Sequence, residues 1–192
     1  VREVKGSAYI DFPVNRTEIH EDYRNNPVEL RKIRQTIDVV RNDPDVRITS
    51  LSIKGYASPE GTYANNTRLA KGRTATLKTY VRELYHFPDS VILTSYEPED
   101  WSGLEAYVDS TNLKNRDAIL ALIRSDMEPD AKEKAIKSTY PEDYRFLLQN
   151  VYPGLRHSDY VVQYVVRTYT DVAEIRRIMK TQPQKLSLRE LY

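Results

Sequence analysis

The residues from Gly55 to Arg73 combine a glycine-containing loop with a basic helix, a pattern that can bind an anion. The stretch GYASPEGTYANNTRLAKGR follows a β-prone run and precedes a helical one. Backbone N–H groups at the start of a helix point outward and can hold an anionic group. The loop has neither the Lys-Ser/Thr of a P-loop nor a G-x-G-x-x-G pattern, so nucleotide binding is not indicated. The alternative is that Gly55 and Gly61 only allow a sharp turn, with Pro59 fixing φ.

Two other groups have the residue types of catalytic sites. His157-Ser158-Asp159 has those of a triad. Neighbours in an extended strand point to opposite faces, however, whereas a triad needs side chains that converge. Glu97, Glu99 and Asp100, beside Trp101, could suggest a glycosidase pair. A charge cluster at the start of a helix is the more usual role of such acids, so no enzyme is predicted.

Metal, cofactor and nucleic-acid sites are not predicted. The chain has no cysteine, and its histidines, His20, His86 and His157, have no ligand spacing. The basic residues of the helix cannot all share one face, so they are expected to be solvated, with Arg73 alone placed near the loop. These residues are Arg68, Lys71, Arg73, Lys78 and Arg82.

The bulk composition is that of a folded domain with balanced charge. The chain has 192 residues, 40% of them hydrophobic and 30% charged, with 29 basic and 28 acidic side chains. This balance argues against a dedicated nucleic-acid binder, and no apolar run approaches the roughly 20 residues of a membrane span. The chain starts at Val1 without a signal peptide or initiator Met, so we expect a fragment or processed form.

The elements that must position the 55–73 loop alternate between strand and helix. Strands are predicted at 7–14, at 46–54 (ended by Gly55) and at 91–96. A first helix is predicted to start with Asn26 as its N-cap, Pro27 at the first helical position and Glu29 at the capping-box position. A second is predicted from about Asn65 to Leu84, with five side chains facing inward: Leu69, Leu77, Tyr80, Val81 and Leu84.

The pattern changes after residue 98. Four short helices are predicted at 101–108, 117–123, 130–136 and 141–151, an insertion that we expect Trp101 to anchor on the sheet. Its tyrosines could serve partner contacts or could be needed to bury the insertion: Tyr107, Tyr140, Tyr144 and Tyr152. The run at 159–170 is rich in Val and Tyr and is predicted to be a strand inside the sheet. Asp171 can cap a further helix, and Leu186 begins another.

The 55–73 stretch resembles the signature of OmpA-like domains, the peptidoglycan-associating modules of Gram-negative envelopes. In that signature Gly is followed by an aromatic residue or His, then Thr, Asp, a second Gly, Ser/Thr, Asn, Leu-Ser and a final Arg. The residues in register are Gly55, Tyr56, Gly61, Thr62, Asn66, Leu69 and Arg73.

The resemblance extends beyond this motif. The β-α-β-α-β order is also that of the family, and Phe12, Asn15 and Ile19 resemble its opening pattern. The resemblance covers about 1–97 and resumes at 156–168, where Arg156 and the long strand look like the terminal strand of the family. The whole looks closest to a subgroup of large envelope proteins that carry such a module before a helical part.

The resemblance implies a ligand and two charged contacts. In the family, the aspartate of the signature holds the ammonium of diaminopimelate in the peptide stem, and the final arginine holds its carboxylate. Arg73 matches the arginine, whereas Ser58 stands where the aspartate is expected. A serine supplies no charge, and losing a charge-assisted contact costs on the order of 1.5–3 kcal/mol. Glu60, two residues on, is a candidate substitute for the missing acid.

We therefore expect an α/β fold, an α+β sandwich with a mixed sheet and its helices on one face. The OmpA-like domain would span 1–170 with a helical insertion at about 98–153, and 171–192 would be a C-terminal helical extension. The expected function is non-enzymatic binding at the periplasmic face of the Gram-negative outer membrane or envelope. The expected ligand contacts are Arg73, Asn66, Ser58, Tyr56 and Glu60.

Two alternatives to peptidoglycan binding are kept. The first is a protein-interaction scaffold that has lost peptidoglycan binding and holds an envelope partner, such as a surface-fibre assembly component, through the helical insertion. The second is a hydrolase, which only the isolated acids support.

Overall fold

A four-stranded mixed sheet organises the chain in the computed structural model, which describes residues 1–167. Its strands are β1 (Arg2–Ala8), β2 (Val46–Tyr56), β3 (Ile92–Glu97) and β4 (Ser158–Val166), in the order β1-β4-β2-β3. β4 is antiparallel to both of its neighbours, whereas β2 and β3 are parallel. The predicted α/β class and the interior position of the last strand are therefore confirmed.

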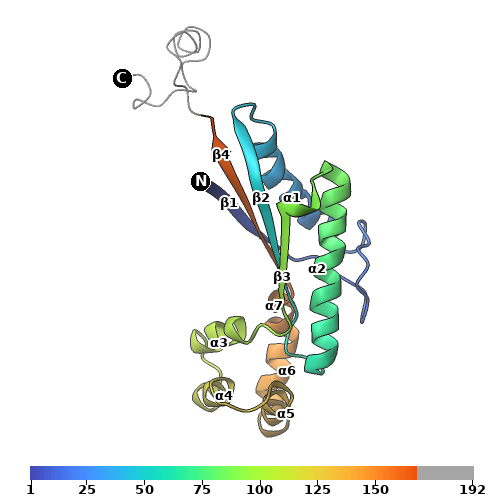
Figure 1. Ribbon diagram of the computed structural model, residues 1–192. Coiled ribbons are helices and arrows are strands. Elements are labelled where there is room, and N and C mark those ends of the chain that lie inside the picture. The colour runs from blue at the N-terminus through green and yellow to red at the C-terminus, as the bar shows by residue number, and fades with distance from the viewer. Residues whose placement is uncertain (168–192) are drawn as a thin grey trace, which may run out of the picture.

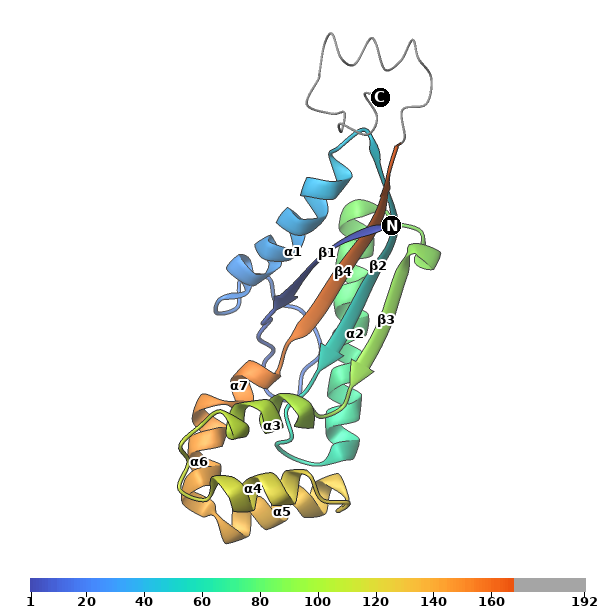
Figure 2. The same ribbon diagram turned by 90° about the vertical axis from the view of Figure 1, so that its left-hand side faces the viewer.

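Two long helices cover one face of this sheet. α1 (Asn26–Arg41) and α2 (Tyr63–Tyr85) lie on the same side, and Figure 2 shows the other face open toward the viewer. A short 3₁₀ turn, η1 (Asp89–Val91), leads from α2 into β3. The core between helices and sheet includes Leu30, Ile37, Ile53, Leu77 and Val162. The amphipathic spacing of the helices thus places their apolar stripes on the sheet.

Between β3 and β4 the chain forms a block of helices at one end of the sheet (Figure 1). Its members are α3 (Trp101–Asp109), α4 (Arg116–Ile123), α5 (Pro129–Thr139), α6 (Pro141–Asn150) and α7 (Tyr152–Leu155). We call α3 to α7 the helical block. It has its own apolar cluster, which includes Leu104, Ile119, Ile136 and Leu147.

The tyrosines of the helical block divide between its core and its surface. Tyr144 and Tyr152 are buried, and both donate hydrogen bonds to the buried carboxylate of Glu133, at 2.5 and 3.0 Å. Burial raises the pKa of Glu133, and the two hydrogen bonds oppose this shift. Tyr107, in contrast, is exposed. Tyr140 is partly buried and packs against the apolar cluster of the block. Burying the block therefore accounts for three of the four tyrosines singled out in the sequence.

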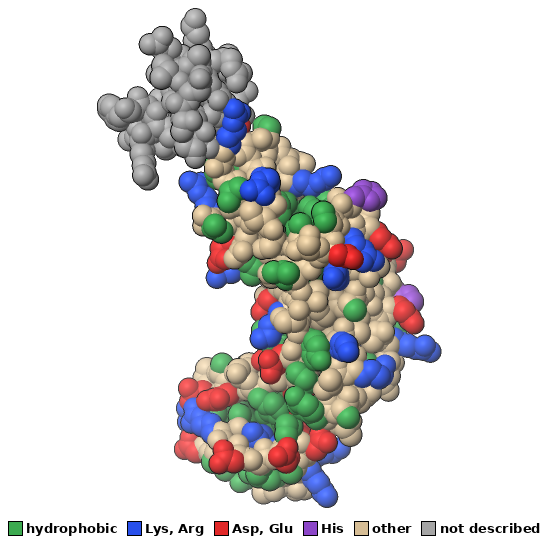
Figure 3. Space-filling view, viewed as in Figure 1, with side chains coloured by type: hydrophobic (Ala, Val, Ile, Leu, Met, Phe, Trp, Pro, Cys, Tyr) green, Lys and Arg blue, Asp and Glu red, His purple; other side chains and the backbone are tan. Residues whose placement is uncertain are grey.

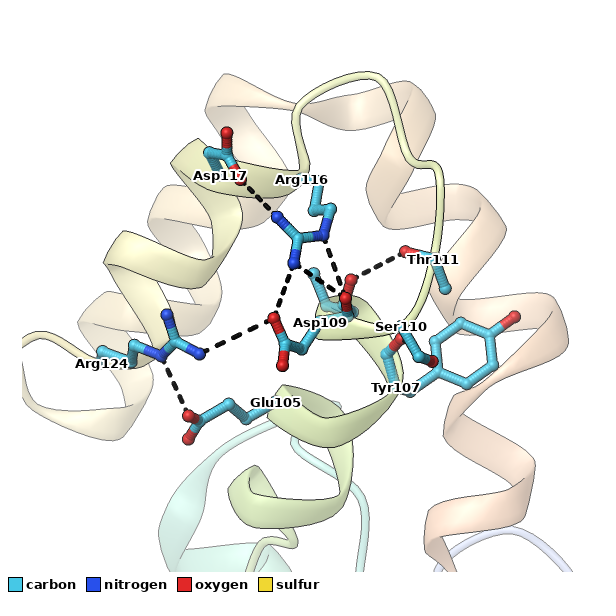
Figure 4. Close-up of polar contacts among 9 residues, drawn as sticks. Glu105, Tyr107, Asp109, Ser110, Thr111, Arg116, Asp117 and Arg124 are labelled. Carbon is cyan, nitrogen blue, oxygen red and sulfur yellow. Dashed lines mark hydrogen bonds and ion pairs between the residues drawn. The ribbon is translucent and has the colours of Figure 1, made fainter.

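An exposed ion network joins α3 to α4 (Figure 4). Arg116 contacts the carboxylate of Asp109 at 2.6 Å and that of Asp117 at 2.5 Å, and its Nε donates to the Asp109 carbonyl. Arg124 contacts Glu105 at 2.9 Å. A single exposed ion pair contributes little to stability, but a network of such pairs orders the side chains that it connects. Here they tie the end of α3 to both ends of α4.

Several predicted boundaries are wrong. The first strand is Arg2–Ala8 and not 7–14, because its partner β4 begins at Ser158, opposite Ala8, and offers no residue with which 9–14 could pair. β2 does not end at Gly55 but continues to Tyr56. In α2, Leu84 is 45% exposed, and Tyr85 faces the core in its place.

The helical elements also differ from the prediction in two respects. Trp101 packs on the apolar cluster of the helical block and not on the sheet. α7 has no counterpart in the sequence prediction. The helices expected after residue 170, and the extension at 171–192, lie outside the described residues. None of the helices described within 1–167 has the length and apolar character that a membrane crossing requires.

The start of α1 differs from the predicted capping box in a way that matters for the loop before it. The N-cap is Asn25, whose side chain makes no capping hydrogen bond. Asn26 is fully buried; its amide accepts from Asp11 N at 2.7 Å and donates to the carbonyls of Asp11 and His20. Glu29, also buried, accepts from Tyr9 N at 2.8 Å. Both side chains therefore fasten the 9–25 loop onto α1.

Replacing Asn26 tests this role. Asn26→Ala removes three hydrogen bonds of a fully buried side chain and leaves partly buried backbone groups of the loop without these partners, so we expect the free energy of unfolding to fall by about 2–4 kcal/mol. Urea denaturation followed by circular dichroism measures this change. The control is Asn42→Ala at the other end of α1, where the exposed residue caps through its backbone and the expected loss is below about 0.5 kcal/mol. Equal losses in the two variants would contradict the assignment.

Candidate functional site

A cleft of about 540 Å³ lies beside the start of α2. Three stretches that are distant in sequence form its walls: the 9–25 loop, residues 57–73 and the segment that precedes β4. Its lining includes Phe12, Ser58, Asn66, Arg73 and Arg156. Four of the five residues predicted as ligand contacts line this cleft, and Tyr56 does not.

The two glycines of the predicted motif have different roles in building the cleft. At Gly55 a Cβ atom would lie 1.9 Å from the Thr74 hydroxyl oxygen, so only glycine allows α2 to approach β2 this closely. Gly61 has φ of +85°, a conformation that favours glycine and turns the chain into α2. Thr62 then caps α2 by accepting from Asn65 N. The turn hypothesis is therefore correct for Gly61 alone.

Arg73 is held in the cleft by contacts that carry no negative charge. Its Nε donates to the Arg16 carbonyl at 3.0 Å, and its guanidinium carbon lies 4.7 Å from the centre of the Phe12 ring. Burial, together with the nearby positive charges of Arg156 and Arg68, lowers the pKa of Arg73 to about 10. Within residues 1–167, no carboxylate forms an ion pair with Arg73. The group is thus a fixed cation without an acidic partner.

Ser58 is turned toward Arg156. It is 3% exposed, and its hydroxyl oxygen accepts a hydrogen bond of 3.0 Å from Arg156 Nε. Arg156 Nη2 also contacts the Glu60 carboxylate at 2.8 Å. Glu60 was the candidate substitute for the aspartate that would hold the ammonium of the ligand, but in the structure it pairs with Arg156. A protein guanidinium now stands at the hydroxyl that was expected to face the ligand.

Asn66 links the cleft to the helical block. It is 4% exposed, and its amide N–H groups donate to the Glu60 carbonyl at 2.8 Å and to a Glu99 carboxylate oxygen at 2.7 Å. The other Glu99 oxygen accepts from the Trp101 indole at 2.9 Å. Because both donors of Asn66 are used within the protein, the residue positions the loop and is not free to donate to a ligand.

Glu99 is the buried acid of this link. Burial raises its pKa to about 7, although the hydrogen bonds from Asn66 and Trp101 favour the ionised form; Asp130 and Glu133 add to the upward shift. Backbone contacts support the same junction, since Asp100 N donates to the Ala57 carbonyl at 2.9 Å. The polar residues after β3 thus attach the block to the cleft.

Tyr56 lies with a different group of side chains. Its ring stacks on that of His157 with centroids 4.3 Å apart, and Lys54 Nζ lies over the Tyr56 ring at 5.2 Å from its centre. Burial raises the pKa of Tyr56. Tyr56 lines only a small cavity of about 20 Å³ beside the main cleft, to which Arg73 and Arg156 also contribute. Of the predicted contacts, it is the one that lies apart.

The groups with catalytic residue types do not converge. His157 Nε2 lies 3.4 Å from Asp159, which accepts a hydrogen bond from Ser7, and Ser158 points to the opposite face of β4. The three acids also have separate contacts. Glu97 pairs with Lys54, Glu99 with Asn66 and Trp101, and Asp100 caps α3 through Gly103 N.

Residues 1–167 contain no group of three or more His, Cys, Asp or Glu that could hold a metal ion. Among the basic residues of α2, Arg68 contacts Asn65 and the Asn15 carbonyl at the edge of the cleft, and Arg82 pairs with Asp89. Arg68 lies close enough to Arg73 for its positive charge to lower the pKa of Arg73. Helical spacing alone did not indicate this interaction.

The titration of Glu99 has a measurable consequence for stability. Between about pH 4.5 and 7 the Glu99 carboxyl stays protonated in the folded chain, whereas it is ionised in the unfolded chain. The free energy of unfolding therefore falls as pH rises through this range. Glu99→Gln does not ionise. We compare the free energy of unfolding of Glu99→Gln with that of the parent protein at each pH. This difference should shift in favour of the variant by about 2 kcal/mol between pH 4.5 and pH 8. Losing one acceptor has a cost that does not depend on pH, and it cancels in this comparison.

Urea denaturation at both pH values measures the change. Glu105→Gln, at an exposed acid of the helical block, is the matched control and should show no comparable dependence. A pH profile of Glu99→Gln parallel to that of the parent protein would contradict the raised pKa.

No protein-family model matches the chain, and no curated protein matches its sequence significantly. The likeness to OmpA-like domains therefore rests on the motif of residues 55–73 and on the order of the elements around it.

Proposed function

We propose that the chain is a non-enzymatic binding module of the Gram-negative cell envelope, located on the periplasmic side. Its cleft would receive a carboxylate of the peptidoglycan peptide stem on Arg73. The observation that carries this proposal is that the Arg73 guanidinium is held in the cleft by Phe12 and the Arg16 carbonyl and has no acidic partner within the described residues.

The chemistry of arginine supports a carboxylate as the ligand group. A guanidinium presents a planar fork of N–H donors that matches the two oxygens of a carboxylate. The Arg16 carbonyl uses only Nε of Arg73, which leaves its terminal nitrogens for a ligand. Stacking on Phe12 orients the group in advance, so that little side-chain entropy remains to be lost on binding. An isolated cation that burial disfavours gains most from an incoming anion.

A second candidate function concerns the helical block. Three large apolar side chains are exposed on it: Tyr107, Met127 and Phe146, at 36, 39 and 42%. Figure 3 shows the molecule hollowed between the sheet and this block. We therefore keep, as the alternative proposal, an envelope scaffold that contacts a protein partner, such as a component of surface-fibre assembly, through the block.

Binding of peptidoglycan fragments tests the first proposal. The parent protein should co-sediment with peptidoglycan and bind diaminopimelate-containing stem peptides saturably in calorimetry. Arg73→Ala should weaken binding by about 10- to 100-fold, because it removes a charge-assisted contact. Arg124→Ala, which removes an arginine from the helical block, should bind like the parent protein.

Thermal melting of both variants verifies that they are folded. If the parent protein does not bind at millimolar stem peptide, or if Arg73→Ala binds as well as the parent, peptidoglycan binding through this cleft is wrong and the scaffold proposal remains.

A further inference from the structure

We infer that the cleft prefers a dianionic ligand, with one negative charge for Arg73 and one for Arg156, and disfavours an ammonium beside Ser58. This inference rests on the proposed binding role of the cleft and specifies its ligand. Two carboxylates on one small molecule, or one doubly charged phosphate, have the required chemistry.

The contact between Arg156 and Ser58 is the first support. An ammonium at Ser58 would have to share the buried hydroxyl oxygen with Arg156, whose Nε donates to it at 3.0 Å. A second cation at this position would lie against the Arg156 guanidinium. Like charges in contact within a partly desolvated cleft repel each other more strongly than in water. The Arg156 guanidinium thus lies where the ammonium of a zwitterionic ligand would bind.

The balance of charge in the cleft is the second support. Its lining contains the arginines Arg24, Arg73 and Arg156 and the acids Asp11 and Glu60. Glu60 is paired with Arg156, while the charges that shift the pKa of Arg73 are those of two other arginines, Arg156 and Arg68. The region around Arg73 is therefore positive.

Both arginines can still bind an anion. Among the described residues 1–167, Arg73 donates only through Nε and Arg156 through Nε and Nη2, so each retains donors for a ligand. Both residues also line the small cavity next to the main cleft, which places them at one site. An anion that contacts both relieves the repulsion between them, and a zwitterion with its ammonium at Ser58 does not.

A matched pair of small ligands tests this selectivity. Pimelate has the carbon chain and the two carboxylates of diaminopimelate but neither ammonium. By calorimetry or NMR titration at fixed ionic strength, the parent protein should bind pimelate at least about tenfold more tightly than free diaminopimelate. Inorganic phosphate, titrated separately, shows whether one doubly charged group suffices or two carboxylates are needed.

Two variants locate the selectivity. Ser58→Asp places a carboxylate against Arg156 and should shift the preference about tenfold or more toward diaminopimelate. Arg156→Gln should remove most of the preference for pimelate while leaving weaker carboxylate binding to Arg73. Arg124→Gln is the control and should keep the selectivity of the parent protein. Circular dichroism and melting temperatures verify that each variant is folded.

The outcomes separate this inference from the proposed function. Tighter binding of diaminopimelate to the parent protein, unchanged selectivity in both Ser58→Asp and Arg156→Gln, or no binding of any probe would overturn the inference. Binding of pimelate or phosphate without binding of peptidoglycan fragments would support the inference and contradict peptidoglycan as the ligand.

Discussion

The position of β4 between β1 and β2 is the constraint on which the rest of the structure depends. Ser158, its first residue, lies opposite Gly55, and Glu97 at the end of β3 lies opposite Tyr56. The helical block therefore leaves the sheet and returns to it at the same end, next to the loop that leads into α2. Because the chain must re-enter there, Arg156 comes to lie beside Ser58, although 98 positions separate them. The cleft is a consequence of this pairing.

Buried polar side chains complete what the strand pairing begins. Asn26 and Glu29 hold the 9–25 loop, and Asn66 and Glu99 join the α2 loop to the helical block. Each of the four is at most 5% exposed. A buried polar group is costly unless its partners are present, so these contacts favour one arrangement of the loops over others. Irregular segments are thereby held in place as the walls of the cleft.

The charge of the cleft follows from a single replacement. An aspartate at position 58 would face Arg156 as an ion pair and would balance the site; Ser58 supplies only a neutral acceptor. Glu60 then serves Arg156 alone, and Arg73 is left with its two arginine neighbours. Within residues 1–167 no acid compensates the charge of Arg73, which is why an anionic ligand is proposed for this site. The loop motif by itself therefore does not specify the ligand; the residue facing each of its positions does.

The sequence by itself determined the elements and their order. Apolar spacing placed α1, α2 and α3 to α6 to within a few residues but missed α7, and the Val- and Tyr-rich run was correctly predicted inside the sheet. These features depend on the local periodicity of apolar residues, which can be read from a short stretch of sequence. The motif also directed attention to Arg73 and Ser58, which do line one cleft.

Only the tertiary structure decided the boundary of β1, the burial of Asn26 and the partners of the cleft residues. The strand ends at Ala8 because β4 begins opposite it, and no local pattern contains that information. The same holds for Arg156, which meets Ser58 and Glu60 only through the register of β4, and for Glu99, whose pKa of about 7 reflects burial beneath the helical block. Side-chain partners and desolvation depend on segments far apart in the chain, so they exist only once the sheet has been assembled.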